Sequence, residues 1–141
     1  MKKFLLSISL VCLLLTSCIS PETRIVSLWE LTTVLLNDKV IFETDIYPNT
    51  PGTWYSFFDG NMLAVTIFIK KDGNIERRES YTGSWRLENK NKEVVINFTL
   101  IDRTYNYTAS VKKLTNKQFI YEYYDKDKNH WRFEMISKSV Y

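Results

Sequence analysis

From about residue 27 onward, apolar and polar side chains alternate with a period of two, and turn-forming residues interrupt the alternation at short intervals. Between residues 93 and 101, for example, Val94, Ile96, Phe98 and Leu100 occupy every second position. This period places alternate side chains on opposite faces of a β-strand, whereas an amphipathic helix needs a period near 3.6. The pattern therefore predicts an all-β domain.

Turn residues divide this region into eight predicted strands. The pairs Asp59-Gly60 and Asp72-Gly73 are strong signals for tight hairpins. Gly83 falls inside the longest predicted strand, where a glycine commonly marks a bulge or a sharp bend. The predicted strands cover residues 27–36, 54–58, 62–70, 75–88, 93–101, 104–114, 118–125 and 130–138.

Short connections between consecutive strands decide the expected architecture. Eight antiparallel strands joined in this way are most simply arranged as an up-and-down barrel, which removes the exposed edges of a flat sheet. A two-sheet sandwich usually needs longer crossing connections, so it is the less favoured alternative. One longer connection, residues 37–53, contains Pro48, Pro51 and Gly52 and is expected to be a loop.

The N-terminus has the layout of a secretory signal peptide over residues 1–17. Met1-Lys2-Lys3 is positively charged, and the mostly apolar stretch 4–15 precedes Thr16-Ser17-Cys18. A stable membrane-spanning helix takes roughly 20 apolar residues, so this stretch is too short to be one.

The residues Leu15-Thr16-Ser17-Cys18 resemble the signal of bacterial lipoproteins. This resemblance implies cleavage before Cys18, a diacylglyceryl group on its sulfur and an acyl chain such as palmitate on its new amine, which together make a stable membrane anchor. Residues 18–26 are then a lipidated tether, and residues 27–141 are the barrel. The expected location is the bacterial cell envelope, with the membrane and its face left open. The alternative is a secreted protein with a cysteine near its cleavage site.

Composition and charge narrow the function further. The chain is 45% hydrophobic, which indicates one folded domain and not a disordered segment. Without its leader the chain carries a net charge of about +1 with both signs interspersed, so no nucleic-acid partner is expected. Cys12 leaves with the leader, so the predicted domain folds without a disulfide.

Three motifs, taken in order, resemble the small lipocalin-like lipoproteins of Bacteroidota. They are a tryptophan early in the first strand (Trp29), an aromatic strand ending in Phe57-Phe58-Asp59-Gly60, and a mid-chain segment at residues 81–85, Tyr-Thr-Gly-Ser-Trp. The lipocalin opening has a glycine two positions before its tryptophan, where this chain has Ser27. The resemblance implies a lipocalin-like barrel and, in the classical branch, a small apolar ligand. That branch also packs an arginine over the tryptophan, a role for which Arg132 is the candidate.

A ligand is expected to enter at the rim that carries the long loop, away from the termini. Phe42, Ile46 and Tyr47 in that loop are apolar enough to form a lid. Arg77 is the one plausible cation there for an anionic head group, with aromatic walls around it. The residues expected to point inward near this rim are Trp54, Arg77, Tyr105, Tyr123 and Trp131.

Two functions stay open on this pattern. An eight-stranded barrel has room for one small ligand or for its own side chains, and these aromatic residues are large enough to fill it. With a pocket, the protein is a membrane-tethered binding protein for a small apolar or amphipathic molecule. With a filled barrel, it is a protein-binding module of the envelope, as lysozyme inhibitors are.

Enzymatic and metal-dependent functions are disfavoured, and no cofactor is expected. The chain has a single histidine, His130, and the predicted domain has no free thiol, so a Cys-His pair or a histidine-rich metal site cannot be built. The stretch Asp125 to Asn129 is similar to the start of a calcium loop. However, His130 and Ile136 stand where such a loop needs glycine and glutamate.

Overall fold

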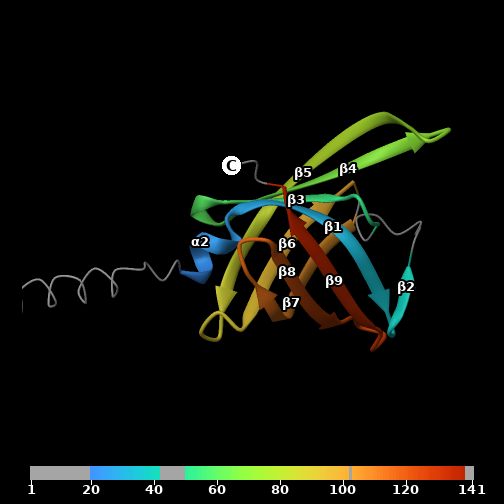
Figure 1. Cartoon of the computed structure of the whole chain (residues 1–141). Coiled ribbons are helices and arrows are strands. Elements are labelled where there is room, and N and C mark those ends of the chain that lie inside the picture. Colours follow the sequence, from blue (N-terminus) through green and yellow to red (C-terminus); the bar gives the residue numbers. More distant parts are fainter. Residues whose placement is uncertain (1–19, 42–49, 102, 139–141) are drawn as a thin grey trace, which may run out of the picture.

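A computed structural model of the chain describes residues 20–41, 50–101 and 103–138. Within these ranges a single antiparallel sheet closes on itself, because β1 pairs with β9 (Figure 1). The elements are α2 (Pro21–Ile25), β1 (Ser27–Leu36), β2 (Lys39–Ile41), β3 (Trp54–Phe58), the 3₁₀-helix η1 (Asp59–Asn61), β4 (Met62–Lys71), β5 (Asn74–Glu88), β6 (Glu93–Leu100), β7 (Arg103–Leu114), β8 (Gln118–Tyr124) and β9 (His130–Ser137).

The eight strands β1 and β3 to β9 form the barrel wall, so the predicted eight-stranded antiparallel barrel is confirmed. Each of these strands pairs with its sequence neighbour in the wall, and the β1–β9 pairing completes the ring. The two-sheet alternative is therefore wrong. Among the described residues, no helix is long and apolar enough to span a membrane.

The segment expected to be a long loop contains an additional short strand, β2. It pairs with the end of β1 through a tight turn at Asn37 and Asp38. Both turn residues have positive φ, 50° and 64°, which is the geometry of the favoured two-residue hairpin. Asn and Asp tolerate this conformation better than other residues with a side chain, so the turn signal was present in the sequence.

The segment expected to be a tether contains the helix α2, which packs against the barrel. Ser20 caps the helix by accepting a hydrogen bond from the Thr23 amide, and Pro21 stands in the first turn, where its missing N–H costs nothing. Ile25 is fully buried in the barrel core. The barrel core therefore includes Ile25, which lies in the segment predicted to be a tether.

The register of β5 with β4 and with β6 runs through Gly83 without a shift, so this glycine does not mark a bulge. The reason for glycine is close approach. A Cβ at this position would lie 2.0 Å from the Asn97 carbonyl oxygen and 2.6 Å from Cβ of Phe98.

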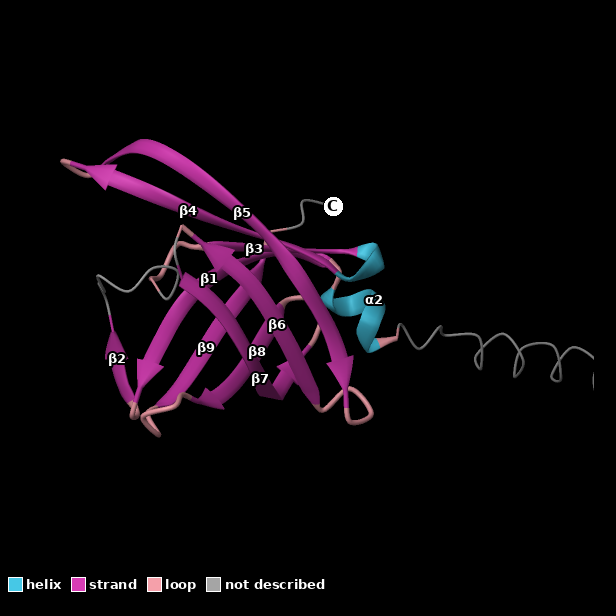
Figure 2. Cartoon of the chain, turned by 180° about the vertical axis from the view of Figure 1, so that it is seen from behind, coloured by secondary structure: helices cyan, strands magenta, loops and turns pink. Residues whose placement is uncertain are grey.

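The β4–β5 hairpin extends beyond the barrel wall (Figure 2). β3 pairs with β4 only as far as Thr66, and β6 pairs with β5 only from Gly83. Between these limits and the turn at 72–73, the two strands pair with each other as a two-stranded ribbon. The ribbon projects from the end of the barrel that lies away from α2 (Figure 1).

Candidate functional site

The barrel has two ends that differ in what closes them. We call the first the α2 end; it carries α2, η1 and the turns at 89–92 and 115–117. The far end carries the turns at 37–38, 72–73 and 125–129. At the α2 end, Ile25 closes the interior, and Trp29 Nε1 donates a hydrogen bond to the Ile25 carbonyl at 2.9 Å.

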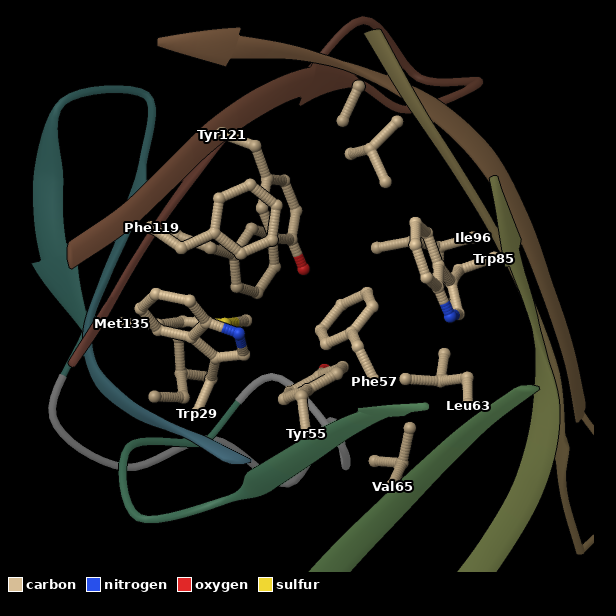
Figure 3. Packing of buried hydrophobic residues seen from close by; sticks show 14 of the residues in the cluster. Trp29, Tyr55, Phe57, Leu63, Val65, Trp85, Ile96, Phe119, Tyr121 and Met135 are labelled. Atoms are coloured by element: carbon tan, nitrogen blue, oxygen red, sulfur yellow. The ribbon is translucent and has the colours of Figure 1, made fainter. Parts of the chain in front are cut away.

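The half of the core near the α2 end is packed with hydrocarbon and aromatic side chains. Phe57 lies between Trp85 and Phe119, with ring centroids 5.7 and 5.8 Å away (Figure 3). Trp29 contacts Phe119 from the other side at 5.7 Å. These large side chains are buried to 5% exposure or less, so the core at this end is side-chain filled.

The half of the core near the far end has a different character, because tyrosines line it. Tyr107 and Tyr121 join their hydroxyl groups at 3.0 Å. Tyr123 stacks on Tyr107 at 4.2 Å, and Tyr105 stacks on Phe98 at 4.9 Å. The aromatic core residues of this half are Tyr55, Phe98, Tyr105, Tyr107, Tyr121, Tyr123, Trp131 and Phe133.

Tyr55 holds the polar group of greatest interest. Its side chain is fully buried, and its hydroxyl has no hydrogen-bond partner among the described residues. A buried polar group left without a partner costs about 1–3 kcal/mol. Native proteins rarely leave such a group unsatisfied, which singles out the Tyr55 hydroxyl among the described polar groups.

The pKa values of Tyr55 and Tyr121 show what these hydroxyls can do. Burial raises the pKa of each phenol well above its ordinary value of 10.0, and the neighbouring tyrosines raise that of Tyr55 further. Both groups stay neutral at physiological pH and act by hydrogen bonding. The described residues of the core include one buried polar residue, Thr53, and no buried charged residue.

Trp54, predicted to point inward, lies on the outer face of the barrel. It stacks edge-on against Phe68 with centroids 4.8 Å apart, in an outer hollow of about 190 Å³. Tyr55 and Phe57 point inward instead, because β3 alternates with a period of two. The polar Ser56 shares the outward face with Trp54 and was the signal in the sequence for this orientation.

Arg77, predicted to be an inward cation, lies on the projecting ribbon. Its side chain is 64% exposed and its Nη2 lies 2.8 Å from Glu79 Oε1. Glu79 also accepts a hydrogen bond from the hydroxyl of Tyr81. Arg77 shares its face of β5 with the buried Trp85 but stands beyond the barrel wall, and Glu79 already compensates its charge.

The three other predicted residues, Tyr105, Tyr123 and Trp131, do lie together in the lining of the far half. Sequence reasoning missed Tyr55, Tyr107, Tyr121 and Phe133 as part of it. Alternation in β7, β8 and β9 places Tyr107, Tyr121 and Phe133 on the inward face. It does not indicate which inward residues meet across the barrel.

The predicted lid residues Phe42, Ile46 and Tyr47 and the predicted lipidation site Cys18 lie outside the described residues. Arg132 does not pack over Trp29. It lies on the outer face, where it donates to Glu122 Oε1 at 2.6 Å and to Glu134 Oε1 at 2.8 Å.

Asp125 holds the turn at 125–129 and the side chain of Trp131 in place through hydrogen bonds. Its Oδ1 accepts hydrogen bonds from the amides of Asp127 and Asn129, and its Oδ2 accepts one from Trp131 Nε1 at 2.9 Å. The Asp125 carboxylate, in the segment similar to the start of a calcium loop, thus accepts hydrogen bonds from its own turn and from Trp131. Within the described ranges, no cluster of histidine, cysteine or acidic residues could hold a metal ion.

We expect Asp125 to stabilise the protein in a pH-dependent way. Desolvation alone would raise the pKa of Asp125, but the hydrogen bonds from Trp131, Asn129 and Asp127 outweigh it and hold the pKa below its ordinary value of 3.8. A lowered pKa in the folded state means that the contribution is present above the unfolded pKa and is lost as the pH falls through the folded value.

Asp125→Ala should therefore unfold at lower urea than the parent at about pH 6, and the gap should narrow near pH 2. Asp127→Ala, in the same turn but exposed, is the control and should show no such gap. A gap that is the same at both pH values would contradict the prediction.

Comparisons with known proteins point to one structural class. No model of a protein family matches the sequence, and no curated protein matches it. Among solved structures, insecticyanin from the tobacco hornworm Manduca sexta, a lipocalin, is similar with a TM-score of 0.54 over 84% of this chain. The fold is lipocalin-like. The sequences are only 15% identical and the chain covers 64% of insecticyanin, so the likeness to a lipocalin extends to the fold and not to the ligand.

Proposed function

We propose that this protein is a lipid-anchored, lipocalin-like binding protein of the bacterial cell envelope, akin to the small lipoproteins of Bacteroidota. It holds a small apolar or amphipathic molecule in the tyrosine-lined half of its barrel. It acts without catalysis and without a resident cofactor. The observation that carries the proposal is the buried Tyr55 hydroxyl, which has no partner among the described residues.

The chemistry of the lining defines what fits. Stacked aromatic rings provide apolar walls, and the phenols provide neutral hydrogen-bonding groups. The described core holds no buried charge, which favours an uncharged body for the ligand. An atom that accepts or donates one hydrogen bond would satisfy the Tyr55 hydroxyl.

Replacing Tyr55 by phenylalanine separates ligand binding from stability. The variant loses a hydroxyl that has no protein partner in the described ranges, so the free protein should keep its stability or gain up to about 1 kcal/mol. The ligand loses a hydrogen bond, so its affinity should fall about tenfold. Native mass spectrometry after incubation with a host lipid and metabolite extract measures the bound adduct, and urea unfolding measures the stability.

Two matched variants control this experiment. Tyr121→Phe removes a hydroxyl that is bonded to Tyr107, so the free protein should lose about 1 kcal/mol. Trp54→Ala changes the outer face only and should leave the adduct intact. A parent protein that shows a clean mass without any adduct would sink the small-ligand proposal and direct the search to protein partners at the far end.

A further inference from the structure

We propose that the α2 end of the barrel is a docking face for an anionic lipid bilayer, and that the barrel sits on the membrane with its tyrosine-lined half pointing away. This inference rests on the lipid anchor proposed above and adds an orientation and a contact surface to it. Three features of the described residues carry it: the point where the chain joins the barrel, an exposed apolar pair, and the distribution of charge between the two ends.

The first feature is how close the anchor must lie to the barrel. Ser20 caps α2, the Arg24 amide donates to the Ser20 carbonyl at 3.0 Å, and Ile25 is buried in the core, so the chain is fixed to the barrel from Ser20 onward. Only two residue steps separate Ser20 from Cys18, and two residues span at most about 7 Å. A lipid on Cys18 would therefore hold the α2 end against the membrane surface.

The second feature is an apolar pair at the same end. Phe58 ends β3 and Met62 begins β4, and the two are cross-strand partners on either side of η1. Phe58 is 48% exposed and Met62 is 57% exposed. η1 borders α2, because residues of both line one surface hollow of about 250 Å³. An exposed aromatic and a flexible thioether beside the anchor suit the boundary between lipid head groups and acyl chains.

The third feature is charge. The described segments that make the α2 end, namely α2, η1 and the turns at 89–92 and 115–117, hold four basic and two acidic side chains, a net charge of +2. The described residues of the far-end turns, at 37–38, 72–73 and 125–129, hold four acidic and two basic side chains, a net charge of −2. The basic residues of the α2 end are Arg24, Lys90, Lys92 and Lys117.

The charge difference between the turns of the two ends favours one orientation of the barrel on an anionic bilayer. Anionic lipids attract basic side chains within about a Debye length of the surface and repel acidic ones. The turn segments of the α2 end would thus be attracted to such a surface more strongly than those of the far end. The anchor, the apolar pair and the charge all select the same orientation, which leaves the proposed binding site facing the aqueous side.

The test uses the mature lipidated protein in vesicles of phosphatidylcholine with about a quarter phosphatidylglycerol. Met62→Cys and Ile75→Cys each introduce one thiol for an environment-sensitive fluorophore, because Cys18 is acylated in the mature chain. Ile75 is the matched control: it is 60% exposed, like Met62, but lies at the tip of the ribbon. With lipids brominated near the head groups, the label at 62 should be quenched about twofold or more and the label at 75 should not.

Charge reversal tests the docking face a second time, with the same measurement of quenching at position 62. Lys90→Glu with Lys92→Glu should reduce the quenching at position 62 at least about twofold, whereas Lys126→Glu with Lys128→Glu, in the far-end turn, should leave it unchanged. Equal quenching at positions 62 and 75, or equal effects of the two charge pairs, would overturn the inference. Intact mass distinguishes the two levels of failure: a mature chain without lipid sinks the anchor itself, and a lipidated chain without quenching at 62 sinks only the docking face.

Discussion

Gly83→Ala is expected to lower the free energy of unfolding by about 3 kcal/mol or more. The added Cβ would meet the Asn97 carbonyl oxygen at 2.0 Å and Cβ of Phe98 at 2.6 Å, and real Cβ contacts do not come this close. Asn97 and Phe98 belong to β6, which pairs with β5 at this point, so relief requires the two strands to separate. Urea unfolding followed by circular dichroism measures the loss.

Gly73→Ala is the matched control for this effect. Gly73 lies in the turn between β4 and β5, has nothing within 4 Å of an added Cβ and has a φ of +79°. It should cost only the strain of a side chain in the left-handed region, about 1 kcal/mol. If the two variants lost the same stability, the prediction that close approach of β6 dominates the cost at Gly83 would be contradicted.

The second large effect is expected at Trp29. Its side chain is fully buried beside Phe119, and its indole N–H bonds the Ile25 carbonyl, so it ties α2 to the barrel. Trp29→Ala should cost about 3–5 kcal/mol, because it leaves a large cavity and an unpaired carbonyl. Trp29→Phe should cost less, about 1–2 kcal/mol, because it keeps most of the packing and loses the hydrogen bond.

Trp54→Ala gives the matched comparison for a second tryptophan near the start of a barrel strand. Trp54 is half-buried on the outer face and contacts Phe68 there. Its loss should cost roughly 1 kcal/mol, because much of its surface already meets solvent. A larger loss for Trp54 than for Trp29 would contradict the assignment of inner and outer faces. Circular dichroism avoids the fluorescence change that each variant brings.

Much of the fold was predictable from the sequence. Alternation with a period of two identified the eight barrel strands, and the short turns identified the closed up-and-down order, because few other topologies join such strands so directly. Alternation also placed Trp131 correctly: it was expected to point inward and is buried. These features depend on local backbone geometry, which the local sequence encodes.

Part of the candidate site was not predictable in this way. Trp54 was predicted to point inward, but Tyr55 and Phe57 are the buried residues of β3, which places Trp54 on the outer face. Arg77 lies on the predicted face of β5 but beyond the barrel wall. The length by which the β4–β5 ribbon extends past β3 and β6 depends on the register between strands.

The sequence by itself determined the strands, their order, the barrel and the separation of inward from outward side chains in most strands. It also contains the apolar N-terminal stretch and Cys18, on which the proposal of a membrane anchor depends. Tertiary structure alone decided that the hydroxyl of Tyr55 is buried without a partner in the described ranges, that Ile25 closes the α2 end, and that Gly83 admits the close approach of β6. The physical reason is that these properties depend on which residues meet across the closed barrel, and strands distant in sequence set those contacts.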